Sequence, residues 1–399
     1  MSATSVWPVL LVLALALASC RLLQAWLRPE AANERFASID GLRGYLALFV
    51  FLHHGCVWYF YLQTGVWKVP PSHLYTHLGQ SSVALFFMIT GFLFFTKLLD
   101  GRRRPIDWPR LLVSRVMRLG PLYLLAMLAL FAMVALLSGG QLRDAPGQLI
   151  GDGLRWLSFT ILGAPDLNGL KRTGQLVAGV TWSLPYEWLF YAALPLLAVL
   201  TRTAVRPLYV LSSAAGVLFI LNFLQPSSAH LLAFGGGIAA ALCARSARCR
   251  AWAAGRVFSL LILALLALLV EVFPWGYGYR QVLLLSLVFC LIACGNSLFG
   301  LLTHPLSRTL GEMAYGIYLL HGLLLSLVLR LLIGVERVAQ LPVLHYWLLI
   351  AGLTPLLLGI CAFSFRYVER PAMLSVPRLT EGLRRASQRL PGLGRRRPV

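Results

Sequence analysis

Residues 257–270 read VFSLLILALLALLV, a run in which Ser259 is the only polar side chain, and residues 345–363 form a second long apolar stretch. A helix rises about 1.5 Å per residue, so that about 20 such residues cross the roughly 30 Å hydrocarbon core of a bilayer. The chain of 399 residues is 59% hydrophobic and only 12% charged, whereas soluble domains carry about a quarter charged residues. These features predict an all-α fold, a polytopic transmembrane helical bundle.

About eleven spans are expected, over residues 6–27, 42–62, 79–98, 119–138, 182–200, 207–224, 229–243, 257–273, 281–302, 310–333 and 345–366. The loops then alternate between two sides of the membrane. One side holds 27 of the 35 Lys and Arg residues, in loops 21–43, 97–118, 201–206, 245–256 and 303–309 and in the tail from residue 366. Basic loops face the cytoplasm, which predicts a cytoplasmic C-terminus and an external N-terminus.

Three regions are expected: an N-terminal transmembrane helix over residues 1–30, a membrane domain over 31–374 and a basic cytoplasmic tail over 375–399. Leu17-Ala18-Ser19-Cys20 is similar to a lipoprotein cleavage site. No Lys or Arg precedes this apolar segment, whereas Arg21 follows it. Cleavage would also reverse the side of every later loop, so we expect the first helix to be retained.

The net charge of +21 does not indicate nucleic-acid binding, because the arginines lie in short loops between apolar segments. Arg102, Arg103 and Arg104 are expected to orient the chain in this way. The His, Cys, Asp and Glu residues form no cluster with ligand spacing, so no metal site is expected.

Arg43 and His54 are expected to share one face of the second span. They are eleven residues apart, which at 100° per residue brings both side chains to the same side of a helix. The helical rise separates them by about 16 Å, which places Arg43 at the cytoplasmic boundary and His54 near mid-membrane. Ionisable groups at that depth point to function. A snorkelling arginine and a hydrogen-bonded core histidine are the structural alternative.

Arg115 and Arg118 are three residues apart and share a helix face where the fourth span begins. A pair of guanidinium groups suits phosphate, although the same residues could serve only to orient the protein. Glu187 follows the long external loop 139–180 and begins the fifth span near the outer boundary. There, a carboxylate gains from the helix N-terminus. Its neighbours Trp182 and Tyr186 are either acceptor contacts or ordinary interfacial aromatics.

Together these segments resemble the membrane acyltransferase 3 family over residues 36 to about 371. The resemblance rests on Ile39-Asp40-Gly41-Leu42-Arg43 with His54, on 86–92 (FFMITGF), on Arg115 with Arg118, on Trp182-Ser183-Leu184 before Glu187, on 315–321 (YGIYLLH) and on Glu369-Arg370-Pro371. Two departures stand out. Thr90 occupies a position where the family usually has Ser, and the N-terminal helix is an addition to a ten-helix core.

The resemblance implies an integral membrane O-acyltransferase of the bacterial cytoplasmic (inner) membrane. Such an enzyme moves an acyl group, often acetyl, from cytoplasmic acyl-CoA to a hydroxyl of an extracytoplasmic glycan, for example an envelope polysaccharide. No permanently bound cofactor is implied, and acetyl-CoA is the expected donor.

Three roles follow for individual side chains. The catalytic candidates are His54, Arg43 and Glu187; the donor-binding candidates are Arg115, Arg118 and Arg43; the substrate-binding candidates are Trp182, Tyr186, Tyr315 and His321. His54 could act as a general base towards the acceptor, or could first accept the acyl group itself. His321 could equally be a structural histidine between helices.

Two other classes of protein fit the same hydropathy. An exporter or flippase of a lipid-linked glycan would also have many spans and buried polar groups. It would have no need for a cytoplasmic arginine pair together with a histidine on the same axis. A non-catalytic membrane scaffold would have no use for a mid-membrane histidine.

Overall fold

The computed structural model describes residues 2–27 and 36–389, and this part of the chain contains helices and no β-strand. The α-helices are α1 (Trp7–Leu27), α2 (Ala37–Thr64), α3 (His73–Asp100), α4 (Trp108–Leu137), α5 (Pro146–Leu157), α6 (Leu184–Leu200), α7 (Pro207–Phe223), α8 (Ser228–Cys243), α9 (Ala247–Ala253), α10 (Arg256–Val272), α11 (Tyr279–Ala293), α12 (Pro305–Glu312), α13 (Ala314–Ser326), α14 (Val335–Ala339), α15 (Val343–Ser364), α16 (Arg370–Leu374) and α17 (Val376–Arg389). Short 3-10 helices cover Thr173–Val177, Val180–Ser183 and Leu301–Thr303, and π-helical turns cover Leu327–Leu332 and Phe365–Glu369.

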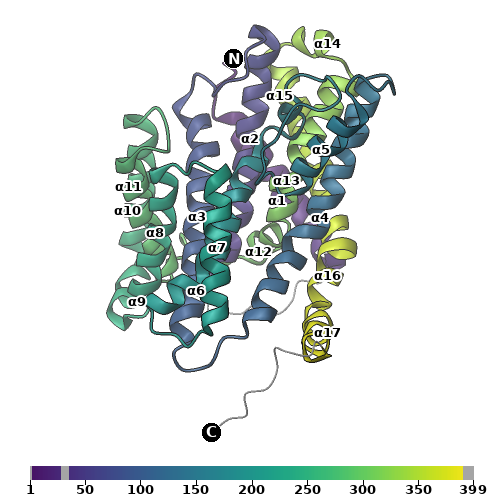
Figure 1. Ribbon diagram of the computed structural model, residues 1–399. Helices are drawn as coiled ribbons and strands as arrows, with labels where there is room; N and C mark the ends of the chain where they lie inside the picture. Colours follow the sequence, from purple (N-terminus) through teal and green to yellow (C-terminus); the bar gives the residue numbers. More distant parts are fainter. Residues whose placement is uncertain (1, 28–35, 390–399) are drawn as a thin grey trace.

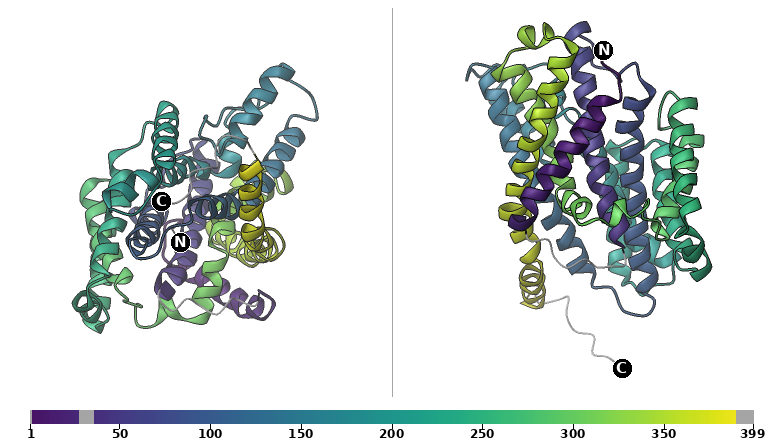
Figure 2. Two further views of the ribbon diagram at one scale, coloured as in Figure 1. Left: turned by 60° about the horizontal axis from the view of Figure 1, so that its bottom comes forward. Right: turned by 180° about the vertical axis from the view of Figure 1, so that it is seen from behind.

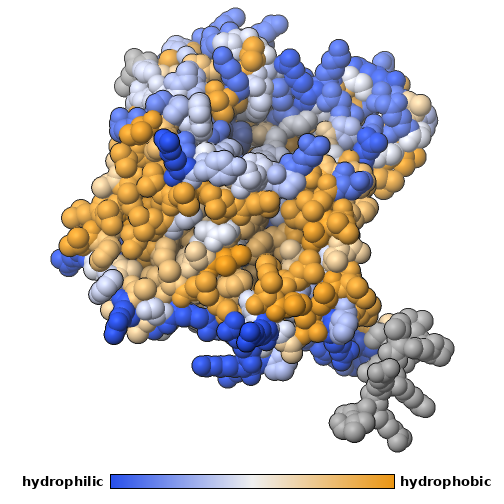
Figure 3. Space-filling view, turned by 60° about the vertical axis from the view of Figure 1, so that its left-hand side comes forward, coloured by the Kyte–Doolittle hydropathy of each residue, from blue (hydrophilic) through white to orange (hydrophobic). Residues whose placement is uncertain are grey.

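The long helices run side by side as a bundle (Figure 1). In the described residues, seven helices are long and apolar enough to cross a membrane, or eight if α8 and α9, which are bent by 106°, form one broken span. A broad hydrophobic band crosses the face of the molecule shown in Figure 3, with hydrophilic residues above and below it. The protein is therefore a multi-pass, all-α membrane protein.

The predicted spans are all helical, and four of them are short. Helices α7, α8, α10 and α11 have only 17, 16, 17 and 15 residues, which is about 23–26 Å at the helical rise and less than the hydrocarbon core. The predicted span 281–302 shows the reason for one of them. Gly295 adopts a φ of 114°, and the Asn296 side chain accepts a hydrogen bond from the Leu298 amide, so that the helix ends at Ala293.

The core of the bundle is formed by α2 and α3, which pack against each other, with α8 beside α3 and α13 beside α2. The most apolar window of α3 is 83% buried, whereas that of α1 is 28% buried. Helix α1 packs on the outside against α15 and α12, as the rear view shows (Figure 2). The first helix is thus a peripheral addition to the bundle.

The segment between α4 and α6 is more than an external loop. It contains the amphipathic helix α5, and its later part enters the bundle, where Leu176, Val177 and Val180 are buried. Gly322 of α13 permits this entry, because a Cβ atom at that position would lie 2.3 Å from the carbonyl carbon of Val177. Irregular backbone is tolerated at membrane depth only where protein surrounds it or it lines a cavity.

The loop between α3 and α4, the short helix α9 and the C-terminal helix α17 lie at one end of the bundle, opposite α14 (Figure 1). We call this the basic end. Two ion pairs connect its parts: Arg245 binds Asp100 at the end of α3, and Arg384 of α17 binds Asp107 with 2.6 Å between Nη2 and Oδ2.

Candidate active site

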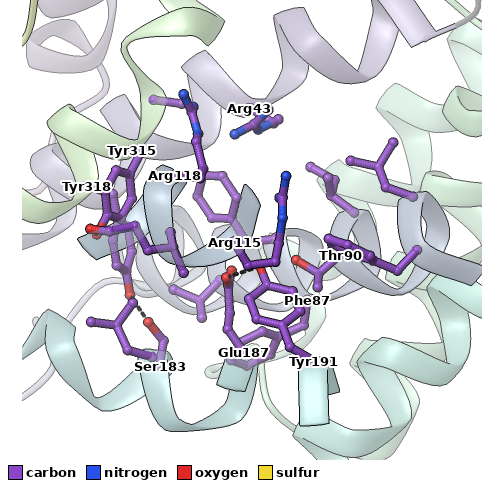
Figure 4. A pocket seen from close by; sticks show the side chains of 18 of the residues that line it. Arg43, Phe87, Thr90, Arg115, Arg118, Ser183, Glu187, Tyr191, Tyr315 and Tyr318 are labelled. Atoms are coloured by element: carbon purple, nitrogen blue, oxygen red, sulfur yellow. Dashed lines mark hydrogen bonds between the residues drawn. The ribbon is translucent and has the colours of Figure 1, made fainter. Parts of the chain in front are cut away.

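A cavity of about 340 Å³ lies between α2, α3, α4, α6 and α13. We call it the arginine cavity, because Arg43, Arg115 and Arg118 all line it. Figure 4 shows their guanidinium groups pointing toward one space. The polar side chains on the remaining walls are Thr90, Ser183, Glu187, Tyr191, Tyr315 and Tyr318.

The three arginines are held by different contacts. Arg118 approaches the buried carboxylate of Glu369, with 3.7 Å between Nη1 and Oε2, and its Nη1 also donates to the sulfur of Met373 at 3.3 Å. Arg43 lies 4.0 Å from Asp40, one turn earlier on α2. Positive charge gathered in a partly enclosed site attracts anions strongly, because the surrounding protein screens it less than water does.

Arg115 lies over the Phe94 ring, with its guanidinium carbon 5.0 Å from the ring centre. An aromatic face attracts such a cation and leaves the N–H groups at the guanidinium edge able to donate. Arg43 of α2 lines the same cavity as the arginine pair of α4, whereas their predicted role in donor binding stays a prediction.

Glu187 lines the arginine cavity together with Arg43 and Arg115, so the predicted separation of this carboxylate from the cytoplasmic arginines is wrong. The inserted segment 173–183 delivers the chain into the bundle, and α6 therefore begins inside it. The Tyr191 hydroxyl, one turn later, donates to Glu187 Oε2 at 2.6 Å. The carboxylate thus shares a cavity with the guanidinium groups, although the sequence predicts the two at opposite sides of the membrane.

A histidine pair lies next to this cavity. The Nε2 atom of His321 in α13 is 3.0 Å from Nδ1 of His54 in α2, and the two ring centres are 5.0 Å apart. His321 is fully buried, whereas His54 is partly exposed. His53 lies beside His54 and bonds to the carbonyl of Tyr75 at 2.7 Å through its own Nδ1.

The hydrogen bonds of the pair fix where its protons are. Nδ1 of His321 lies 2.8 Å from the carbonyl oxygen of Ile317, and a carbonyl can only accept, so this nitrogen carries the proton. Nε2 of neutral His321 is then an acceptor for His54. Nδ1 of His54 faces this acceptor and the carbonyl oxygen of Val50, also at 3.0 Å. Nδ1 of His54 therefore carries a proton, which leaves the lone pair of the neutral ring on Nε2, and the Ala178 backbone also bonds to this ring.

Tyr318 connects the histidine pair to the arginine cavity. Its ring centre is 6.4 Å from that of His321, and the same residue lines the cavity. The Tyr318 hydroxyl bonds to Ser183 at 2.8 Å and donates to the carbonyl of Val180 at 3.1 Å. Tyr315 donates to the carbonyl of Leu119 at 2.8 Å. His54 is not one of the described residues that line the cavity.

Trp182 and Tyr186 lie outside the lining of the arginine cavity. Both pack against His230 and Phe87. The ring centre of Trp182 lies 5.0 Å from that of His230 and 6.1 Å from that of Phe87, and Trp182 is 37% exposed. Phe87, from the motif 86–92, connects the two places, because it lines the arginine cavity and also contacts Tyr186 of this aromatic group. His230 carried no signal in the sequence, since a single histidine at a helix start has many explanations.

In the part of the chain that the structure describes, no group of three or more His, Cys, Asp or Glu side chains could hold a metal ion. The chemistry available is that of guanidinium groups, one cavity carboxylate and an oriented imidazole.

The described residues thus combine an arginine-lined cavity with a nearby histidine pair inside a helical membrane bundle. The family model described as an acyltransferase domain, that of the acyltransferase 3 family, matches residues 36–365. The chain belongs to this family and is a membrane acyltransferase. The match begins just before α2 and so leaves α1 outside the family domain. Comparison with curated proteins and with solved structures gave no match.

Proposed function

We propose that this acyltransferase moves an acyl group, acetyl in the first instance, from cytoplasmic acyl-CoA to a hydroxyl of an extracytoplasmic glycan. The observation that carries the proposal is the convergence of Arg43, Arg115 and Arg118 on one cavity beside the His54–His321 pair. Coenzyme A is a polyanion that cannot cross lipid, so its donor site needs cations that are reached from the cytoplasm.

The charge distribution supports the orientation. By the positive-inside bias, the basic end faces the cytoplasm of a bacterial inner membrane in this proposal, and the C-terminal helix α17 lies at that end. Arg115 and Arg118 lie within the first three turns of α4, which begins at the basic end. The donor therefore enters between α3 and α4, with its phosphates on the arginines and its thioester directed toward Tyr318 and the histidines.

The chemistry follows from the proton positions. A sugar hydroxyl has a pKa far above neutral, so attack on a thioester needs a general base, and imidazole serves that role at neutral pH. Nε2 of His54 takes the hydroxyl proton while the oxygen attacks the thioester carbonyl. The carbon–sulfur bond then breaks, an ester forms, and the thiolate receives a proton and leaves as coenzyme A. If His54 is instead the acyl carrier, the same nitrogen attacks first.

Glu187 has a different role in this proposal from the one its predicted position suggested. Beside the guanidinium groups and bonded to Tyr191, it orients the arginines and the donor, while the acceptor approaches from the opposite side. The aromatic group around Trp182 then remains a candidate contact for the glycan, because aromatic faces pack well against sugar rings.

Mass spectrometry of surface glycans from cells that express the wild type or His54→Ala tests the proposal. We expect the acyl mass to be present with the wild type and absent with the variant at equal protein level in the membrane. His345→Ala is the matched control, because His345 is exposed and lies outside the pair, and it should leave acylation unchanged. Unchanged acylation in His54→Ala would refute the proposal, and loss of the whole glycan would indicate export.

A further inference from the structure

A second cavity, of about 440 Å³, lies at the basic end between the last turn of α3 and the first turns of α4. We call it the basic-end cavity. Three cations line it, Lys97, Arg104 and Arg110, and Pro105, Ile106 and Leu111 give it an apolar wall. The expectation that Arg104 serves only to orient the chain does not account for its place in this wall.

The two cavities follow one another along the contact between α3 and α4, which we call the seam. On α3, Thr90, Leu93 and Phe94 line the arginine cavity, and Lys97 and the C-cap residue Gly101 line the basic-end cavity. These positions follow the three- and four-residue spacing of a single helix face. On α4, Leu111 and Ser114 line the basic-end cavity, and Arg115, Arg118 and Leu119 line the arginine cavity.

The two sets of lining residues follow closely on one another along α3, because Phe94 and Lys97 are separated by a helical rise of only about 4.5 Å. The lining from Thr90 to Gly101 extends over about 17 Å. A ligand that fills both cavities must therefore be long, flexible between its ends, and anionic along the end that lies in the basic-end cavity.

The charge balance of the basic-end cavity favours an anion. Its two acids, Asp100 and Asp107, are both bound by arginines from elsewhere, Arg245 of the α8–α9 turn and Arg384 of α17. Asp107 also caps α4 by accepting a hydrogen bond from the Arg110 amide at 3.2 Å. Within the described residues, no ion pair is found for the side chains of Lys97, Arg104 and Arg110.

We propose that the basic-end cavity binds the 3′-phosphorylated adenosine of the acyl-CoA donor. Lys97, Arg104 and Arg110 hold the 3′-phosphate, and the apolar wall takes the adenine ring. The 5′-diphosphate lies toward Arg115, and the pantetheine arm continues along the seam into the arginine cavity. This inference rests on the proposed donor and adds to it a second site with its own specificity, for the phosphorylated ribose.

The test uses the purified full-length chain and isothermal titration calorimetry with three probes: coenzyme A, 3′-dephospho-coenzyme A and adenosine 3′,5′-bisphosphate. Hydrogen bonds to a charged group are worth enough for a roughly ten- to hundredfold preference for coenzyme A over its dephospho form. The double variant Arg104→Ala/Arg110→Ala should lose that preference and bind both forms with the dephospho affinity. Arg103→Ala is the matched control from the same loop and should retain the preference.

The wild-type measurement alone keeps the inference falsifiable if the double variant does not fold. Equal wild-type affinity for coenzyme A and 3′-dephospho-coenzyme A would overturn it, as would a folded double variant that keeps the full preference. Failure of the proposed donor looks different, because the wild type would then bind none of the three probes. Binding of adenosine 3′,5′-bisphosphate that is weakened in the double variant would support the site independently of the pantetheine arm.

Discussion

His321 should act on the reaction through His54 and not through the fold. Its Nε2 accepts from Nδ1 of His54 at 3.0 Å, and its own Nδ1 donates to the Ile317 carbonyl at 2.8 Å. His321→Phe removes the acceptor while filling the buried space, and His321→Gln offers an amide oxygen in its place. Both variants keep a sizeable side chain in the buried space, and they differ in whether an acceptor atom is available to His54.

The expected loss can be estimated from the hydrogen bond. When Nε2 of His54 takes up the acceptor proton, the imidazole becomes cationic, and the bond to His321 becomes a bond from a charged donor. Such bonds contribute about 1.5–3 kcal/mol, which corresponds to a fall in kcat of roughly ten- to hundredfold for His321→Phe. Val50 still accepts from Nδ1 of His54 at 3.0 Å, so the loss should stay below the roughly hundred- to ten-thousandfold effect of removing a general base.

The assay is acyl transfer from labelled acetyl-CoA to acceptor glycan in membranes, with kcat and the KM for acetyl-CoA measured separately. His321→Phe should lower kcat and leave the KM near its wild-type value, because His321 does not line the arginine cavity. His321→Gln should recover part of the rate. In a His54→Ala background, His321→Phe should cost little more, since residues that act as one unit are not additive.

Two results would refute this reasoning. An equal fall in rate for the Phe and Gln variants would mean that the acceptor atom is irrelevant. A His321→Phe effect of the same size in the His54→Ala background would mean that His321 acts independently of His54.

Three further predictions concern the surroundings of the site. Gly322→Ala should lower the melting temperature and the activity, because its Cβ would lie 2.3 Å from the Val177 carbonyl carbon, whereas Gly352→Ala at an open position of α15 should be tolerated. Fluorescence melting curves compare the two variants, and an unchanged curve for Gly322→Ala would contradict the close packing. Arg118→Lys keeps the charge but loses the planar guanidinium group that can bind phosphate with two hydrogen bonds. Steady-state kinetics should show the KM for acetyl-CoA rising by roughly tenfold with kcat little changed, and an unaltered KM would argue against a phosphate contact. A fluorescent-protein fusion at the C-terminus should fluoresce and an alkaline phosphatase fusion there should be inactive, and the reverse pattern would contradict a cytoplasmic basic end.

The sequence predicted the features that depend on one helix at a time. Arg115 and Arg118 lie on α4 and both line the arginine cavity, as their helical spacing predicts. Arg43 and His54 lie on the single helix α2, but of these two only Arg43 lines that cavity. Composition was sufficient for the membrane class, because a chain with this little charge cannot cover a soluble surface.

Features that depend on contacts between distant segments could not be predicted. The depth of Glu187 depends on how segment 173–183 enters the bundle beside Gly322. The bond between His54 and His321 joins residues that are 267 positions apart. The place of Arg104 depends on how the loop after α3 folds back onto α4. None of these has a periodic signal in the sequence.

The most direct test of the account follows the acyl group across the membrane. Inside-out membrane vesicles, whose cytoplasmic face is outward, would receive labelled acetyl-CoA from outside, and the label in the luminal glycan would be measured with the wild type and with His54→Ala. We expect incorporation with the wild type, none with the variant, and none when right-side-out vesicles replace inside-out ones. Equal incorporation by His54→Ala, or incorporation from acetyl-CoA on the periplasmic face, would contradict transfer from the cytoplasm through His54.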